Sequence, residues 1–185
     1  MEAPVKPKMR TVDMAYIALF AVVMAVCAWI SIPGAVPFTL QTFGVFLAVG
    51  LLGGKRGTLA VLVYLLLGAV GMPVFAGFNG GLGYMLGATG GYIVGFVLSA
   101  LVMWGMEALP SKKTWVLALS MVLGLAVCYA FGTAWFMVVY AQKTGPIGLA
   151  TALGLCVIPY IVPDLVKIAL ALLLQKLLSA AIRLR

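Results

Sequence analysis

The chain has 185 residues, of which 65% are hydrophobic and 9% are charged, and its mean hydropathy is +1.21. Soluble domains carry about 25% charged residues, so this composition excludes a soluble protein. It predicts an all-α integral membrane protein, with residues 1–185 as one transmembrane domain. The net charge of +8 comes from basic residues clustered between apolar runs. That placement is typical of membrane topology determinants and argues against nucleic-acid binding.

The composition also argues against a metal or redox centre. The chain has no histidine, which is the commonest metal ligand and general base. Its three cysteines, Cys27, Cys128 and Cys156, are dispersed in apolar sequence without metal-ligand spacing. We therefore predict no metal site and no bound cofactor, and interpret the cysteines as small apolar residues.

The first predicted span covers residues 14–32 and follows a basic segment, residues 1–12, which we predict to be a cytoplasmic tail. A stripe of small residues lies on one face of this helix: Ala18, Ala21, Ala25 and Ala28. Such stripes let a second helix approach closely. The stripe indicates either packing inside the subunit or docking of a partner subunit.

The second apolar run, residues 38–52, is too short for a complete span. Its helix would rise about 22 Å, against a hydrocarbon core of about 30 Å. Either the helix ends below the membrane surface, or the loop before it dips into the membrane and lines a cavity. Thr39, Gln41 and Thr42 would then place polar groups in that cavity.

Glycine is frequent around the third and fourth spans, residues 58–75 and 84–108. The loop between these spans contains Asn79 within a glycine-rich stretch, and Gly91 and Tyr92 lie near the start of the fourth span. Glycine allows a backbone or a ligand to approach closely. A nucleotide site is excluded, since no Lys-Ser/Thr pair follows the glycines. A tight basic turn over residues 53–57 is predicted before the third span.

The fifth span covers residues 115–140, and a polar loop is predicted over residues 142–146. Residues 149–160 are too few to span a membrane and indicate a surface or re-entrant helix. The sixth span runs from Pro163 to residue 182, with Pro163 in the first turn of its helix.

Asp164 and Lys167 are the charged residues of this sixth span that lie nearest its start. They are three positions apart, so a helix places them on one face. Charges within a membrane usually face a cavity or each other. The pair therefore indicates either a functional site or a structural ion pair.

Basic clusters alternate along the chain with loops that are nearly free of basic residues. The positive-inside rule therefore predicts six spans with both termini in the cytoplasm. The outside loops then carry residues 37–41, Asn79 and the approach to Asp164. This convergence predicts an outward-facing pocket for a small solute with polar and apolar parts.

Five motifs together resemble the BioY family, over about residues 14–180. The family comprises the biotin-specific substrate-binding (S) components of energy-coupling factor (ECF) transporters. The motifs are VPFTLQ (36–41), LLGAVGMPVF (66–75), NGG (79–81), GATGGY (87–92) and PDLVK (163–167). The resemblance implies the six-helix S-component fold in a prokaryotic plasma membrane, with biotin captured at the outer face. It also implies two kinds of partner: a transmembrane T subunit and two ATPase subunits, which bind the ATP.

The resemblance also implies roles for individual residues. Asn79 and Asp164 match residues that hydrogen-bond the ureido ring of biotin, and Lys167 matches a lysine that could meet the valerate carboxylate. The stripe with Ala21 and Ala25 resembles the motif by which S components dock on the T subunit. The expected substrate-binding set also includes Gln41, Gly91 and Tyr92. Gln41 and Tyr92 offer polar side-chain groups, and Gly91 allows a ligand to approach the backbone.

The sequence departs from the family pattern at two positions. Ala88 stands where proline is usual, and Ile93 stands where some members have arginine. The ligand carboxylate is therefore expected to depend on Lys167 or on backbone amides. Alternative functions are an S component for another small vitamin, a passive channel or a membrane enzyme. The enzyme is disfavoured because the chain offers neither a nucleophile–base pair nor a metal site.

Overall fold

The computed structural model describes residues 9–109 and 114–179, which are mainly helical. The elements follow in the order α1 (Thr11–Trp29), β1 (Ser31–Ile32), β2 (Phe38–Thr39), α2 (Gln41–Leu52), α3 (Gly54–Ala69), the 3-10 helix η1 (Ala76–Phe78), α4 (Leu82–Met85), α5 (Gly90–Glu107), α6 (Thr114–Lys143), α7 (Leu149–Cys156) and α8 (Ile158–Leu178). Strands β1 and β2 pair antiparallel in a short hairpin.

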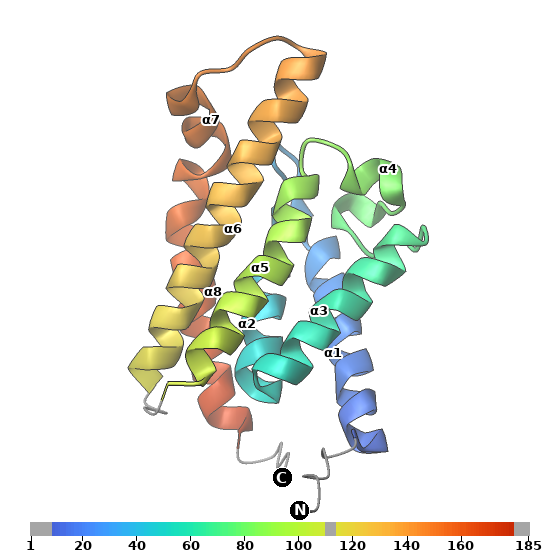
Figure 1. The fold of residues 1–185 in the computed structure, drawn as a ribbon, viewed down its shortest axis with the longest axis vertical. Coiled ribbons are helices and arrows are strands. Elements are labelled where there is room, and N and C mark those ends of the chain that lie inside the picture. The colour runs from blue at the N-terminus through green and yellow to red at the C-terminus, as the bar shows by residue number, and fades with distance from the viewer. Residues whose placement is uncertain (1–8, 110–113, 180–185) are drawn as a thin grey trace, which may run out of the picture.

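The long helices form a bundle along the long axis of the molecule (Figure 1). At one end of this bundle α1 begins, α2 turns into α3 and α8 ends; we call it the tail end. The β1–β2 hairpin, α4 and α7 lie at the other end, which we call the loop end. Segments that are far apart in the sequence therefore meet at the loop end.

Three described helices are long and apolar enough to cross a membrane, namely α1, α5 and α6. A fourth candidate is the pair α7 and α8, which are bent by 41° at the break between them. α2 and α3 have 12 and 16 residues and are shorter than these spans. The described part of the chain thus has the helical membrane character that the composition predicts.

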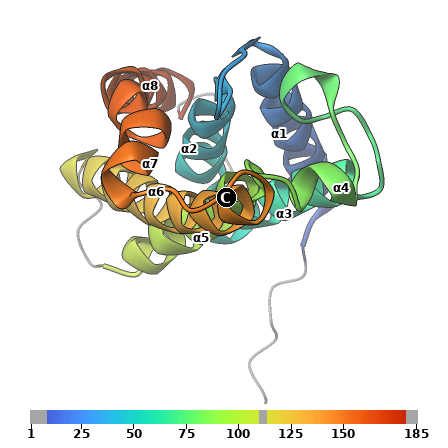
Figure 2. The same ribbon diagram turned by 90° about the horizontal axis from the view of Figure 1, so that it is seen from above.

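α2 lies at the centre of the bundle and packs against α1, α3, α5 and α8 (Figure 2). Eight of its 12 residues are buried. The chain enters it through β2, and the Leu40 N–H donates to the Cys27 carbonyl of α1 at 3.1 Å. The helix thus begins inside the protein, and the segment before it contacts α1 and lines the cavity described below.

α5 and α6 approach each other closely because glycines replace side chains on the facing surfaces. A Cβ added to Gly91 would collide with Trp135, and one added to Gly132 would collide with the ring of Tyr92. Small residues allow such close helix contacts in membrane proteins. Gly91, a predicted ligand contact, therefore has a packing role here.

Several predicted boundaries are wrong. The predicted turn over residues 53–57 is confined to Gly53, whose φ is +80°, because α3 begins at once with Gly54. The Gly54 N–H donates to the Glu107 carboxylate at 2.5 Å, which caps α3 with a side chain from α5. The third span ends at Ala69 rather than 75, and Gly71 follows with a φ of +99°.

The C-terminal half differs from prediction in two places. Helix α6 continues through Lys143, so the predicted loop over residues 142–146 begins later. Pro163 lies inside α8 rather than in its first turn, because the break falls at Val157 and Pro159 occupies the first turn instead. The predicted tail, residues 1–12, ends earlier than expected, because α1 begins at Thr11. Its first eight residues and the basic clusters at residues 6–8, 112–113 and 183–185 lie outside the described residues.

Candidate functional site

A cavity of about 60 Å³ lies between the helices towards the loop end. Its walls come from the segment before α2, the start of α2, η1, α4, α5, α6, α7 and α8. The lining residues are Val36, Pro37, Thr39, Gln41, Thr42, Ala76, Tyr84, Thr89, Tyr92, Ile93, Phe96, Cys128, Tyr129, Cys156, Tyr160, Asp164 and Lys167. The wall is largely apolar, with aromatic rings and a few polar groups, as is usual for small-molecule sites.

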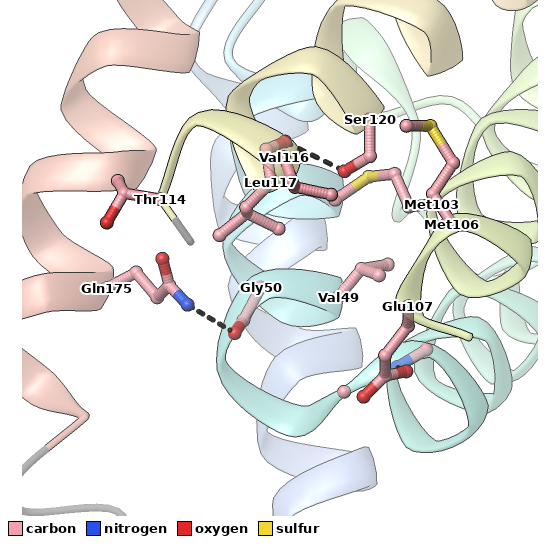
Figure 3. Close-up of a pocket in the computed structure, with 12 residues that line it drawn as sticks. Val49, Gly50, Met103, Met106, Glu107, Thr114, Val116, Leu117, Ser120 and Gln175 are labelled. Atoms are coloured by element: carbon pink, nitrogen blue, oxygen red, sulfur yellow. Dashed lines mark hydrogen bonds between the residues drawn. The ribbon is translucent and has the colours of Figure 1, made fainter. Parts of the chain in front are cut away.

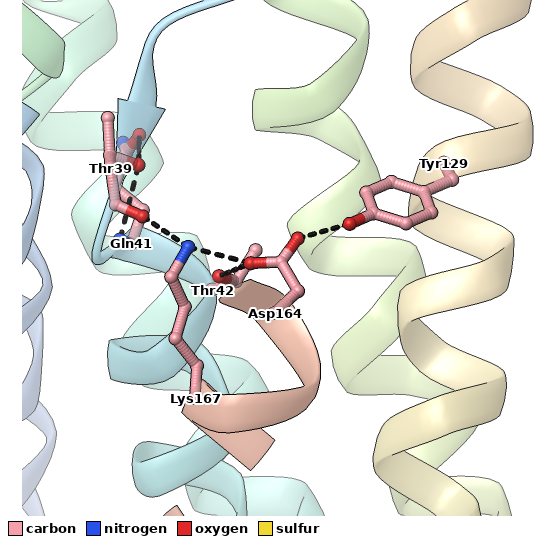
Figure 4. Close-up of polar contacts among 6 residues, drawn as sticks. All are labelled: Thr39, Gln41, Thr42, Tyr129, Asp164 and Lys167. Atoms are coloured by element: carbon pink, nitrogen blue, oxygen red, sulfur yellow. Dashed lines mark hydrogen bonds and ion pairs between the residues drawn. The ribbon is translucent and has the colours of Figure 1, made fainter. Parts of the chain in front are cut away.

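Asp164 is the centre of the polar contacts in this cavity (Figure 4). Its side chain is buried, and its Oδ1 accepts from Lys167 Nζ at 2.6 Å and from Thr42 Oγ1 at 3.0 Å. Its Oδ2 accepts a hydrogen bond from the Tyr129 hydroxyl of α6. The carboxylate is thus held from α2, α6 and its own helix.

Lys167 is also buried. Besides the carboxylate, its Nζ donates to the Thr39 carbonyl at 2.6 Å and lies 4.2 Å from the centroid of the Phe38 ring. Two of the three donors of the ammonium therefore have hydrogen-bond acceptors, and the Phe38 ring packs against the group. Lys167 therefore joins α8 to the segment that leads into α2.

A second polar network supports the start of α2 from behind. The Gln41 Nε2 donates to the Tyr64 hydroxyl at 2.5 Å, and that hydroxyl donates to the Val74 carbonyl at 2.9 Å. The Thr39 hydroxyl donates to the Gln41 Oε1 at 2.9 Å. Since all these groups are buried, their hydrogen bonds fix the backbone whose Thr39 carbonyl receives Lys167.

The loop that covers the cavity is attached to α8. The Tyr160 hydroxyl donates to the Val36 carbonyl, and the Tyr160 ring stacks with that of Phe38 at a centroid distance of 6.3 Å. Because Val36 and Tyr160 both line the cavity, their hydrogen bond joins two of its walls.

The structure brings four of the predicted site residues together. Gln41, Tyr92, Asp164 and Lys167 all line the cavity. Asn79 does not: it is exposed, and its Nδ2 donates to the Ala76 carbonyl at 2.8 Å. Ala76 does line the cavity, so Asn79 lies on the loop beside it. Gly91 faces Trp135 rather than the cavity.

The sequence interpretation missed Tyr129, which contacts Asp164 directly. It lies in a long apolar run of α6. The available signal was a hydroxyl in the middle of a predicted span, where polar groups require partners. Tyr64 was also missed, because it too lies in an apolar run. Its side chain is buried in the structure.

The structure favours internal packing for the alanine stripe of α1. Ala21 and Ala25 are 1% and 5% exposed and belong to the subunit's own core. The neighbouring helices of the subunit cover both residues, and the docking of a partner at this stripe stays a prediction. Ala18 is exposed on the same helix.

A larger cavity of about 230 Å³ lies near the tail end, between α2, α5, α6 and α8 (Figure 3). Three of its polar side chains, Glu107, Ser120 and Gln175, already have hydrogen-bond partners within the protein. The Gln175 Nε2 donates to the Gly50 carbonyl at 3.0 Å, and Glu107 caps α3. It contains no buried charge, so we place the candidate site in the smaller cavity around Asp164 and Lys167.

The fold and this cavity define a helical membrane protein with a buried ion pair, Asp164 and Lys167, in a cavity between its helices. The BioY family profile matches residues 2–184. The chain therefore belongs to the BioY family, as its motifs predict.

Relatives and a solved structure support this membership. The chain is 43% identical to the biotin transporter BioY of Thermotoga maritima, over 84% of this chain and 89% of the relative. It is 40% identical to the probable biotin transporter BioY of Pyrococcus horikoshii, over 92% and 98%. A crystal structure of the S-component for biotin from an ECF-type ABC transporter superposes with a TM-score of 0.81, at 25% identity, over 94% of this chain and 95% of that one.

Proposed function

We propose that this chain is the biotin-binding S component of an ECF-type ABC transporter. The observation that carries the proposal is the buried Asp164 carboxylate, which lines the cavity and is held by Thr42, Tyr129 and Lys167. A carboxylate offers about four acceptor positions. Three are occupied, so one position on Oδ2 remains for an N–H of the ureido ring.

Biotin binding requires the cavity to enlarge. Ligand pockets usually measure about 300–1,000 Å³, whereas this one measures about 60 Å³. The segment most directly placed to move is the loop before α2, whose Val36 carbonyl is tied to Tyr160. We propose that this loop opens for entry and that Asn79, on the neighbouring loop, reaches the ureido ring when the site closes again.

The topology that we propose has six spans, with both termini in the cytoplasm of a prokaryotic cell and the loop end at the outer face of its plasma membrane. The cavity at the loop end and the basic residues Lys55 and Arg56 at the start of α3 support this orientation. A T subunit and two ATPase subunits would supply the ATP-driven step. The superposed crystal structure is that of an S-component from an ECF-type ABC transporter, which supports this assembly.

The proposal is tested on the protein purified without added ligand. Mass spectrometry of the released small molecules is expected to find biotin, and titration of the emptied protein with biotin is expected to saturate at one equivalent. Recovery of a different vitamin, with no response to biotin, would contradict biotin specificity. Solute flux in liposomes containing this chain alone would indicate a channel instead.

A further inference from the structure

The charges inside the cavity cancel. Of the Lys and Arg residues that the structure describes, Lys167 is the one that lines the cavity, and Asp164 is its acidic counterpart. Arg10 precedes α1, Lys55 and Arg56 open α3, and Lys176 closes α8, all at the tail end. The remaining described cation, Lys143, is exposed at the end of α6.

Lys167 is already committed to partners within the protein. Its Nζ is shared between Asp164 Oδ1, the Thr39 carbonyl and the face of Phe38, and its side chain is 5% exposed. Turning one N–H towards a ligand would leave the buried Thr39 carbonyl or the Asp164 carboxylate short of a partner. The polar network around Gln41 and Tyr64 keeps that carbonyl in place.

An anionic group beside this pair would gain little. Asp164 lies 2.6 Å from Lys167 Nζ, so a ligand carboxylate near the lysine would also lie near the aspartate. The pair has no net charge, and taking a further anion out of water is strongly unfavourable without a counter-charge. A neutral group that offers N–H donors meets no such penalty at Asp164 Oδ2.

We propose that the site recognises the neutral bicyclic head of biotin, and that the negative charge of the biotin carboxylate does not contribute to binding. The inference rests on the proposed function and deepens it by naming the substrate class. That class comprises ureido-ring compounds with a free or an amide-linked side chain, including biotin joined to an amine. The carboxyl end points to the loop end and stays in water, and Lys167 acts as a positioning residue for Asp164 and Thr39.

The test compares three ligands by titration of the purified full chain: biotin, its N-methyl amide, and biotin methylated on a ureido nitrogen. The amide has no charge, so its Kd is expected to lie within about 3-fold of that of biotin, whereas the ureido-methylated compound is expected to bind at least about 10-fold more weakly. A carboxylate held by Lys167 would instead make the amide about 10- to 100-fold weaker and would overturn the inference.

Two variants give a second measurement that does not depend on absolute affinity. The ratio of the Kd values for amide and biotin is expected to stay unchanged in Lys167→Met and in Lys143→Gln. A ratio that shifts towards the amide in either variant would identify that lysine as the carboxylate partner and overturn the inference. If the wild-type protein binds none of the three ligands, the proposed biotin function itself fails.

Discussion

At the scale of single residues, the site depends on one buried carboxylate and the hydrogen bonds that aim it. Asp164 and Lys167 were predicted as neighbours on one helix face, and the structure confirms their contact at 2.6 Å. The alternatives of a functional site and a structural pair are not exclusive, because the same aspartate holds Lys167 and lines the cavity. Its replacement is therefore expected to change both biotin affinity and stability.

Asp164→Asn is expected to weaken biotin binding by about 10- to 100-fold, since hydrogen bonds to charged groups contribute roughly 1.5–3 kcal/mol. The change also leaves Lys167 buried without its counter-charge, so the ligand-free melting temperature falls. Biotin titration and thermal melting measure the two effects. If the Asp164→Asn protein is destabilised but binds biotin with unchanged affinity, the aspartate has a structural role only.

A double variant separates these two effects. Asp164→Asn combined with Lys167→Met removes the unpaired charge, so the melting temperature is expected to recover while biotin affinity stays low. Recovery of affinity in the double variant would be incompatible with a ligand contact at Asp164.

Asn79→Ala is expected to weaken biotin binding less than Asp164→Asn, by about 5-fold, because the hydrogen bonds of Asn79 are neutral.

Tyr129→Phe removes one hydroxyl and keeps the ring that packs in α6. The Asp164 Oδ2 loses the partner that orients it, so biotin affinity is expected to fall by about 10-fold. The matched control is Tyr140→Phe, which lies on the same helix outside the cavity. Equal affinities for the two variants would show that the Tyr129 hydrogen bond does not shape the site.

At the scale of the element, α1 shows how a small-residue pattern can be read in two ways. Its alanines were candidates for internal packing and for partner docking. The structure places Ala21 and Ala25 against the subunit's own core, and leaves Ala18 exposed. The distinction depends on which side of the helix the neighbouring helices cover.

Ala21→Leu combined with Ala25→Leu is expected to destabilise the isolated subunit by about 1–3 kcal/mol for each site, because both side chains would overpack the core. The predicted result is a lower melting temperature. On heating, biotin binding is lost as the protein unfolds. Ala18→Leu on the exposed side serves as the control and should melt like the wild type. Normal melting and binding with uptake abolished would restore the docking interpretation.

At the scale of the whole molecule, the two ends of the bundle differ in chemistry. The cavity, Asn79 and the short α4 and α7 lie towards the loop end, while the start of α3 with Lys55 and Arg56 lies at the tail end. This separation is the basis for proposing that the loop end faces outwards. The membrane orientation can be measured directly.

Single cysteines introduced as Thr144→Cys and Lys55→Cys are expected to react from opposite sides of the membrane, since both positions are exposed and lie at different ends. Labelling of whole cells with an impermeant maleimide should modify residue 144 alone. The native cysteines, Cys27, Cys128 and Cys156, are buried and provide a low background. Modification of both positions from outside would exclude the proposed six-span topology.

The sequence by itself determined the membrane class, the long helices and the pairing of Asp164 with Lys167. These features depend on composition, on run length and on neighbours within one helix turn, all of which are local properties of the chain. Its motifs also led to the BioY family, which the family profile confirms. Helix ends were less accurate, because Gly53 and Val157 end elements through backbone conformations that composition does not specify.

Only the tertiary structure decided which distant groups meet. Thr39 and Thr42 reach α8 across more than 120 positions of sequence, and Tyr129 reaches Asp164 from another helix. Membrane helices are apolar on their lipid-facing and protein-facing sides alike, so periodicity does not reveal which side is buried. The orientation of Ala21 and the contacts of Lys167 with Thr39 and Phe38 therefore follow from helix packing, which places their partners around them.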